Sequence, residues 1–166
     1  MRELLFAVYH SKGATRVLKI ASKAGVILTL PVAALLLYKS LSLSPISAAK
    51  LILITGVPFL LVTLLRKILD LPRPYEVYDF YETAPKEKRG QSFPSRHVFS
   101  ITLIGTVACF VYPWLGAALL AVGVIMATAR VLLGIHFIRD VIAGALIGAL
   151  SGVIGVLLTA PFTPLA

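Results

Sequence analysis

The feature that most constrains this chain is a series of five long apolar blocks, at residues 24–40, 46–65, 98–112, 115–133 and 141–160. About 20 apolar residues in a helix cross the ~30 Å hydrocarbon core of a bilayer, and the blocks approach or reach that length. The whole chain is 58% hydrophobic and only 14% charged, whereas roughly a quarter of the residues in a soluble domain are charged. The sequence therefore predicts an all-α fold, a multi-pass transmembrane helical bundle of five spans, and excludes a water-soluble globular enzyme.

Two segments lie outside these blocks. Residues 1–23 hold a short apolar run followed by a basic stretch, without the long apolar core of a signal peptide, and we expect an N-terminal interfacial helix there. Residues 70–94 carry five of the seven acidic residues and four prolines. Connections longer than about 12–15 residues are usually functional or disordered, so we predict a long active-site loop. The chain is short enough that residues 1–166 are expected to form a single membrane-embedded domain.

Cysteine content and net charge further limit the classes of protein to which this chain can belong. Cys109 is the only cysteine, which excludes a disulfide scaffold. The net charge of +9 would suggest nucleic acid for a soluble protein. In a membrane protein it more often indicates cations at the bilayer surface or an anionic substrate. We therefore expect a membrane partner and no nucleic acid.

The five-span topology brings the ionisable residues to one membrane face. Arg66 ends the second block and residues 95–97 precede the third, so both lie on the side that the long loop occupies. The hairpin of blocks three and four returns the chain to this face at Arg130, and a short turn containing His136 leads to Asp140. Ionisable groups at membrane depth are costly and usually functional. The residues expected to converge are Arg66, Arg73, Arg96, His97, Arg130, His136 and Asp140.

These side-chain types in one pocket favour chemistry on an anion. Several arginines offer planar donor forks that suit phosphate or carboxylate oxygens, and two histidines supply a nucleophile and a proton donor near neutral pH. Asp140, expected at the N-cap of the fifth span, lies four residues after His136 and can accept a hydrogen bond from its ring. We expect no metal, because the arginines would repel a divalent cation and no metal-ligand spacing occurs. His10 lacks such partners and is expected to be structural.

Three motifs at these positions resemble the type 2 phosphatidic acid phosphatase superfamily, in its membrane branch. Residues 66–74 are Arg, six residues, then Arg-Pro, where the family has Lys, six residues, Arg-Pro. Residues 94–97 are Pro-Ser-Arg-His, where the family has Pro-Ser-Gly-His. Residues 129–140 are Ala-Arg, five residues, His, three residues, Asp, where the family begins with Ser-Arg. All three motifs occur in order and at the family's spacing, with Arg66, Arg96 and Ala129 as the departures.

The resemblance implies a metal-independent phosphatase that hydrolyses a lipid phosphate or pyrophosphate. By this resemblance His136 attacks phosphorus and forms a phosphohistidine, His97 protonates the leaving oxygen, and Asp140 orients His136. The residues that the resemblance assigns to phosphate binding are Arg66, Arg73, Ser95, Arg96 and Arg130. It implies no cofactor, a lipid phosphate substrate in the bilayer such as undecaprenyl pyrophosphate or phosphatidylglycerol phosphate, and a bacterial cytoplasmic membrane with an extracytoplasmic catalytic face.

Two other functions fit the same residues. A lipid phosphotransferase would use this site with an alcohol in place of water. A non-enzymatic protein that binds anionic lipid would use only the basic face, but it has no use for a histidine oriented by Asp140. A soluble haloperoxidase, which shares the family's site, is excluded by the five apolar blocks.

Overall fold

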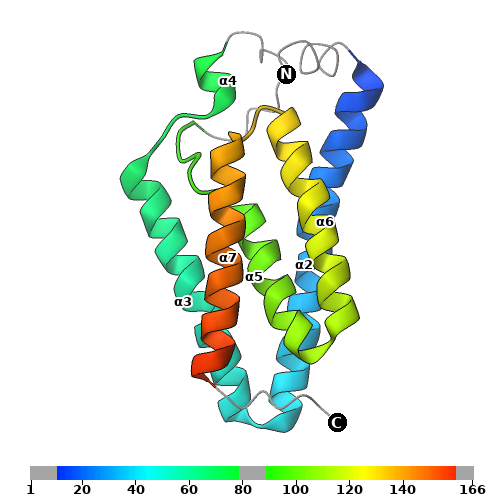
Figure 1. The fold of residues 1–166 in the computed structure, drawn as a ribbon, viewed down its shortest axis with the longest axis vertical. Helices are drawn as coiled ribbons and strands as arrows, with labels where there is room; N and C mark the ends of the chain where they lie inside the picture. The colour runs from blue at the N-terminus through cyan, green and yellow to red at the C-terminus, as the bar shows by residue number, and fades with distance from the viewer. Residues whose placement is uncertain (1–10, 79–88, 160–166) are drawn as a thin grey trace.

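The structure is a computed structural model in which residues 11–78 and 89–159 are described. The helices are α2 (Lys12–Leu43), α3 (Pro45–Leu69), the short α4 (Pro74–Val77), α5 (Arg96–Val111), α6 (Pro113–Leu132) and α7 (Ile138–Leu158) (Figure 1). No strand occurs in these two stretches of chain. The prediction of an all-α helical bundle is confirmed.

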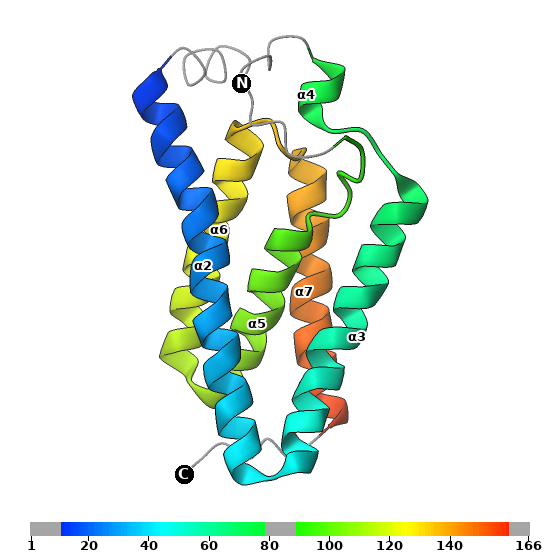
Figure 2. The ribbon, with the colours of Figure 1, turned by 180° about the vertical axis from the view of Figure 1, so that it is seen from behind.

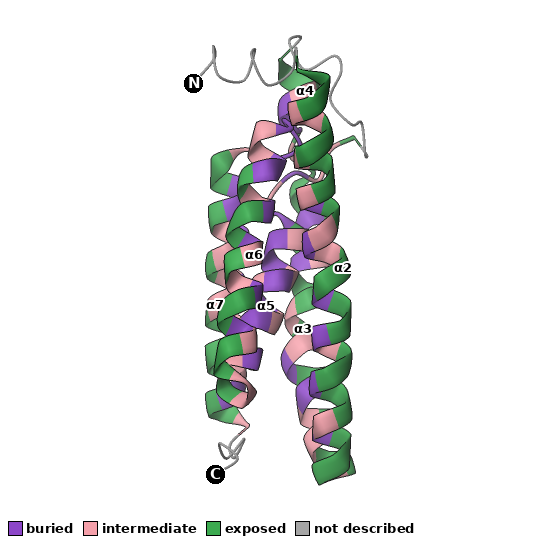
Figure 3. Cartoon of the chain, turned by 90° about the vertical axis from the view of Figure 1, so that its right-hand side faces the viewer, coloured by how far each residue is buried: buried purple, intermediate pink, exposed green. Residues whose placement is uncertain are grey.

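Helix α5 forms the centre of the bundle. It contacts α2, α3, α6 and α7, which surround it in both views of the ribbon (Figures 1 and 2). Its side chains Phe99, Ile101 and Val107 have no exposed surface. Large apolar side chains such as Leu60 and Leu157 are instead exposed on the surrounding helices. The exposed positions of these helices lie on the outside of the bundle (Figure 3). Apolar surface on this scale needs another apolar phase against it, as expected for a protein in a bilayer.

Four helices, α2, α3, α6 and α7, are long and apolar enough to cross a membrane. Helix α5 has 16 residues and therefore extends only about 24 Å at about 1.5 Å per residue. It begins deeper in the bundle than α7 does (Figures 1 and 2). The five predicted spans thus correspond to four full-length helices and one shorter central helix, which the others shield from lipid.

The prediction of a separate interfacial helix is wrong for residues 12–23, which form the first turns of α2; residues 1–10 lie outside the described residues. The helix begins after Ser11, whose hydroxyl accepts a hydrogen bond from the Ala14 N–H at 3.3 Å. Between Gly13, in the first turn, and Gly25 the sequence contains no further glycine or proline that would interrupt the helix. Gly25 packs directly against Met126 of α6, so this end of α2 is part of the bundle.

A stripe of glycines on α7 allows α5 to approach closely. A Cβ atom at Gly144 would lie 2.6 Å from the Ser95 carbonyl oxygen, and one at Gly148 would lie 2.6 Å from that of Phe99. Small residues in such a stripe typically allow two helices in a membrane protein to pack closely. The close contact places the start of α5 beside the start of α7, and the Ser95 N–H donates to the Asp140 carbonyl at 2.9 Å.

Candidate active site

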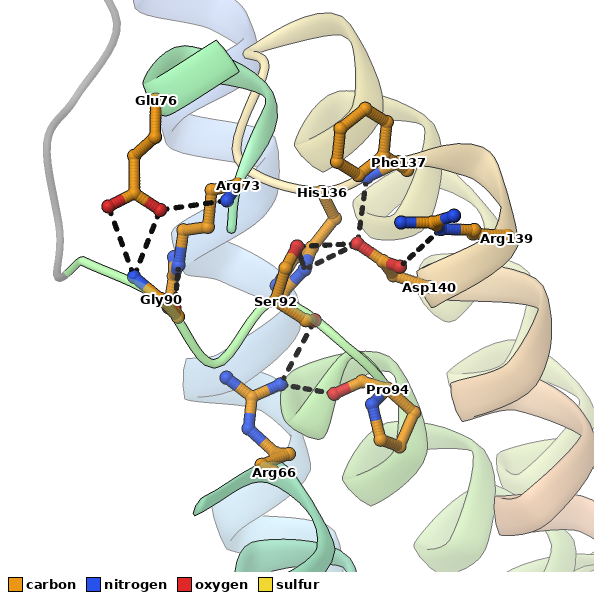
Figure 4. Close-up of polar contacts among 10 residues, drawn as sticks. All are labelled: Arg66, Arg73, Glu76, Gly90, Ser92, Pro94, His136, Phe137, Arg139 and Asp140. Carbon is orange, nitrogen blue, oxygen red and sulfur yellow. Dashed lines mark hydrogen bonds and ion pairs between the residues drawn. The ribbon is translucent and has the colours of Figure 1, made fainter. Parts of the chain in front are cut away.

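The predicted site residues gather at one end of the bundle. They come from the end of α3, the segment 89–95, the start of α5, the end of α6 and the turn 133–137 before α7. In Figure 4 the side chains of Arg66, Arg73, Ser92, His136 and Asp140 surround one region of this end. The topology argument from the sequence therefore places Arg66, Arg73, His136 and Asp140 as the structure does, whereas it did not include Ser92.

His136 and Asp140 face each other across the first turn of α7. The Nδ1 atom of His136 lies 3.7 Å from Oδ2 of Asp140, and both side chains are buried. The N-cap of α7 is Phe137 rather than Asp140, which corrects the predicted N-cap position. Asp140 lies one turn further along, and its Oδ2 atom accepts a hydrogen bond from the Phe137 N–H at 3.0 Å. The same carboxylate therefore holds the start of the helix and faces the imidazole ring.

The environment of His136 keeps its ring neutral at physiological pH. Burial lowers the pKa of His136 to about 4, and repulsion from Arg130 and Arg73 acts in the same direction, while the contact with Asp140 partly opposes the shift. A neutral imidazole has one nitrogen with a free lone pair. That nitrogen is available as a nucleophile, so burial favours the chemistry predicted for His136.

Three arginines around His136 are buried. The exposed fractions are 7% for Arg66, 4% for Arg73 and 2% for Arg130. Asp140, with no exposed surface, is the one buried carboxylate among the described residues. Three buried guanidinium groups and one buried carboxylate give the described part of this site a net positive charge, which favours binding of an anion.

Two of these arginines also hold the segment 89–95 in place. The Nη1 atom of Arg66 donates to the carbonyl oxygens of Ser92, at 3.3 Å, and Pro94. The Nε atom of Arg73 donates to the Gly90 carbonyl at 3.0 Å (Figure 4). The segment that leads into α5 is therefore fixed by the same side chains that supply the positive charge.

Glu76 on α4 completes this arrangement. Its carboxylate accepts hydrogen bonds from the backbone N–H of Gly90 at 2.9 Å and of Arg73 at 2.8 Å (Figure 4). Gly90 has a φ of 64°, and a Cβ atom there would collide with the Asp70 carboxylate. Glycine is therefore required at this position, and the two sides of the long loop are joined at its base.

The start of α5 brings three more predicted residues to the site. Ser95 is fully buried, and its Oγ atom has no hydrogen-bond partner among the described residues. His97 follows in the first turn of the helix and is half-buried. Arg96 is exposed, and its guanidinium lies 5.7 Å from the centre of the Phe59 ring on α3. Its backbone N–H belongs to the first turn of α5, where such donors have no partner within the helix.

Sequence reasoning missed two serines that contact these residues. The Ser92 hydroxyl donates to Oδ2 of Asp140 at 2.5 Å, and the Ser22 hydroxyl on α2 accepts from Nη1 of Arg130 at 3.1 Å. Ser92 stands within the predicted loop without any motif that marks it. Ser22 could have been found, because it begins a series of small buried residues with Gly25 and Thr29 that is typical of a helix interface.

The described part of the chain holds no group of three or more histidine, cysteine or acidic side chains arranged to bind a metal ion. The charges that could hold an anion here belong to arginine side chains. What the arrangement can do chemically is to bind an oxyanion next to a neutral, buried imidazole.

Comparisons with known proteins agree with this geometry. No curated protein sequence matches the chain. Among solved structures, it is similar to the crystal structure described as the first transmembrane PAP2 type phosphatidylglycerolphosphate phosphatase from Bacillus subtilis, with a TM-score of 0.60 and 20% sequence identity. The match covers 95% of this chain and 93% of that one, which shows a shared fold. The sequence profile of the PAP2 superfamily matches residues 47–163. That range is more than half of the chain and contains all three motifs, so the chain belongs to the PAP2 superfamily.

Proposed function

We propose that this protein is a metal-independent phosphatase that hydrolyses a lipid phosphate or pyrophosphate through a phosphohistidine intermediate. The observation that carries the proposal is the set of three buried arginines around a buried, neutral histidine, with Asp140 as the only buried carboxylate among the described residues. A phosphoryl group carries its charge on oxygens, which guanidinium forks bind well. The family membership and the fold support the same reaction class.

In the proposed mechanism Nε2 of His136 attacks phosphorus in line with the leaving oxygen. The new N–P bond forms as the P–O bond breaks, and the leaving oxygen takes a proton from His97. His97 then removes a proton from water, the water oxygen bonds to phosphorus, and the N–P bond breaks to release phosphate. Because both steps place charge on the equatorial oxygens, fixed positive groups are expected to supply the largest part of the catalysis.

Several groups are placed to stabilise that charge. A guanidinium has five N–H donors, so Arg66 can hold the backbone of residues 92–94 with Nη1 and present its other nitrogens to phosphate. Arg73 and Arg130 are buried on the same side of the bundle. The Ser95 hydroxyl, fully buried and without a hydrogen-bond partner in the described chain, and the backbone N–H of Arg96 at the start of α5 complete the phosphate site.

The lipid chain of the substrate has a place beside this site. A cleft of about 480 Å³ lies between α6 and α7 and is lined by apolar side chains that include Ala127, Val131 and Ala145. Its lining also includes Leu132 and Ile138, which flank the turn that carries His136. A hydrocarbon chain in the cleft would lead directly to a phosphate at His136. Phosphatidylglycerol phosphate, undecaprenyl pyrophosphate and phosphatidic acid all have this form.

On the resemblance to the family alone, we place the catalytic face outside the cytoplasm, in a bacterial cytoplasmic membrane. Phosphate chemistry demands the arginines on either side of a membrane, so they carry no information about orientation. The basic residues at the start of α2, which include Lys12, Arg16, Lys19 and Lys23, favour the opposite orientation by the positive-inside rule. Labelling of a Thr83→Cys variant that lacks Cys109 decides between the two orientations of the catalytic face. A membrane-impermeant maleimide labels intact cells if the site faces outward, and labels only lysed cells if it faces the cytoplasm.

The experiment that tests the proposed function is phosphate release from the three lipids above, in detergent with EDTA and no added alcohol. We expect release by the wild-type protein and a loss of several orders of magnitude in His136→Ala, since removal of a nucleophile commonly has that effect. The His10→Ala variant serves as the control and is expected to keep its activity. Release only after an alcohol is added would favour a phosphotransferase, and restoration by Mg²⁺ or Zn²⁺ after EDTA would contradict the metal-independent mechanism.

A further inference from the structure

The Ser92 hydroxyl contacts both His136 and Asp140. It donates to Oδ2 of Asp140 at 2.5 Å and lies 3.5 Å from Nδ1 of His136 (Figure 4). The direct distance from Nδ1 to Oδ2 is 3.7 Å, so the Ser92 hydroxyl lies closer to each of the two groups than they lie to each other. Ser92 is only 1% exposed, so bulk water does not compete for these contacts.

We propose that Ser92 is a positioning residue that links the imidazole of His136 to the carboxylate of Asp140. A hydroxyl has one donor and two acceptor lone pairs. It can therefore accept from the Nδ1–H of His136 while it donates to Asp140. This arrangement keeps the proton on Nδ1 and leaves the lone pair of Nε2 free to attack phosphorus. The inference rests on the proposed function and deepens it, because it assigns the tautomer of the nucleophile to a residue outside the three motifs.

The backbone around Ser92 is anchored on both sides, which fixes the hydroxyl in place. The Ser92 N–H donates to the Leu71 carbonyl at 2.9 Å, and the Ser92 carbonyl accepts from Arg66. On the other side, Asp140 is held by the Phe137 N–H. A linking group that is held this way needs little reorganisation when the reaction begins.

The link also matters after attack. When Nε2 bonds to phosphorus, the imidazole ring acquires positive charge while Nδ1 keeps its proton. Asp140 then stabilises that charge through the polarised Ser92 hydroxyl, as the third member of a catalytic triad does. Partners that orient a functional histidine typically contribute about 10- to 100-fold to activity, and we expect an effect of that size here.

Kinetics on Ser92 variants test the link. We expect Ser92→Ala to lower kcat about 10- to 100-fold with little change in KM, and Ser92→Thr, which restores a hydroxyl, to recover most of the loss. Ser92→Cys has a weak donor in place of a strong one and serves the same test if the alanine variant does not fold. Ser40→Ala is the matched control, because Ser40 is a buried serine, 2% exposed, near the opposite end of α2. A Ser92→Ala enzyme within twofold of wild type would overturn the proposal.

A double-mutant cycle tests whether Ser92 and Asp140 act through one shared interaction or contribute to catalysis independently. If Ser92 acts through Asp140, adding Ser92→Ala to Asp140→Asn should lower kcat by no more than about twofold. Losses that multiply would show that the two side chains act separately and would overturn the link.

Side-chain ¹⁵N NMR of histidine gives a readout that does not depend on turnover. We expect His136 to be protonated at Nδ1 in the wild type, and Ser92→Ala to shift it toward the Nε2-protonated form, with Ser40→Ala unchanged. An unaltered tautomer in Ser92→Ala would overturn the proposal even if the protein hydrolyses lipid phosphates. If the wild-type protein showed no phosphatase activity, the proposed function would fail while this measurement still decided the link.

Discussion

Nη1 of Arg130 on α6 donates a hydrogen bond of 3.1 Å to the hydroxyl of Ser22 on α2. Both side chains are buried, at 2% and 6% exposure. Ser22 lies outside residues 47–163, the range that matches the superfamily profile. Helix α2 therefore contributes a contact to an arginine of the third motif.

This contact predicts that Ser22→Ala weakens phosphate binding. A hydrogen bond to a charged group contributes about 1.5–3 kcal/mol, and we expect kcat/KM for a lipid phosphate to fall roughly tenfold. Inhibition by inorganic phosphate should weaken in parallel, because the loss concerns how Arg130 is held. Ser40→Ala on the same helix should retain wild-type values. Equal behaviour of the two variants would show that Ser22 does not position Arg130.

The low pKa of His136 predicts how this residue titrates. With its pKa lowered to about 4 by burial, the ring should remain neutral when the pH falls from 7 to 5, whereas an ordinary histidine has a pKa of about 6.5. Between pH 4 and about 6.5 the unfolded chain therefore binds more protons at His136 than the folded chain does. Stability should therefore decrease as the pH falls from about 6.5 toward 4. A ¹⁵N NMR titration, assigned with His136→Asn, checks this, and a midpoint near pH 6.5 would contradict it.

The close contact of α5 and α7 predicts opposite effects for two glycine substitutions. Gly144→Ala places a Cβ atom 2.6 Å from the Ser95 carbonyl, and overpacking of this kind typically costs about 1–3 kcal/mol. Gly56→Ala on α3 meets nothing within 4 Å and should gain up to about 1 kcal/mol from helix propensity. Thermal unfolding in detergent should give a lower Tm for the first and an equal or higher Tm for the second. An unchanged Tm for Gly144→Ala would contradict the packing described here.

The cleft between α6 and α7 predicts a dependence on substrate chain length. Ala127→Trp fills the cleft and should raise KM for a long-chain lipid phosphate at least severalfold, while leaving hydrolysis of a short-chain analogue near wild type. Ala118→Trp, on an exposed part of the same helix, is the matched control. If both substrates respond equally to Ala127→Trp, the lipid chain lies elsewhere.

Much of the fold could be predicted because apolar length alone determines where a chain crosses a bilayer. The five long helices and the convergence of Arg66, His136 and Asp140 followed from counting spans. The full length of α2 could not be predicted this way. Residues 12–23 include several basic residues. This segment is joined to the bundle by the packing of Gly25 on Met126. Met126 lies about a hundred positions further along the chain, so the contact cannot be read from the local sequence.

The site was predictable only where a motif or a charge at membrane depth marked it. Ser92 and Glu76 carry neither signal, because their roles arise from how the long loop folds back on itself. The sequence also did not predict at which position of α7 Asp140 lies. Asp140 lies three residues after the N-cap Phe137, and only the turn after α6 determines where α7 begins.

We propose that His136 becomes phosphorylated during turnover, and trapping the phosphorylated protein is the experiment that decides this. The protein would be mixed with a lipid phosphate labelled with ³²P, denatured in alkaline detergent after milliseconds, and digested for mass spectrometry. Our account predicts an acid-labile, alkali-stable phosphate on the peptide that contains His136. It should be absent from His136→Asn and retained in His10→Asn. Label on another residue, or phosphate release by His136→Asn at the wild-type rate, would contradict the account.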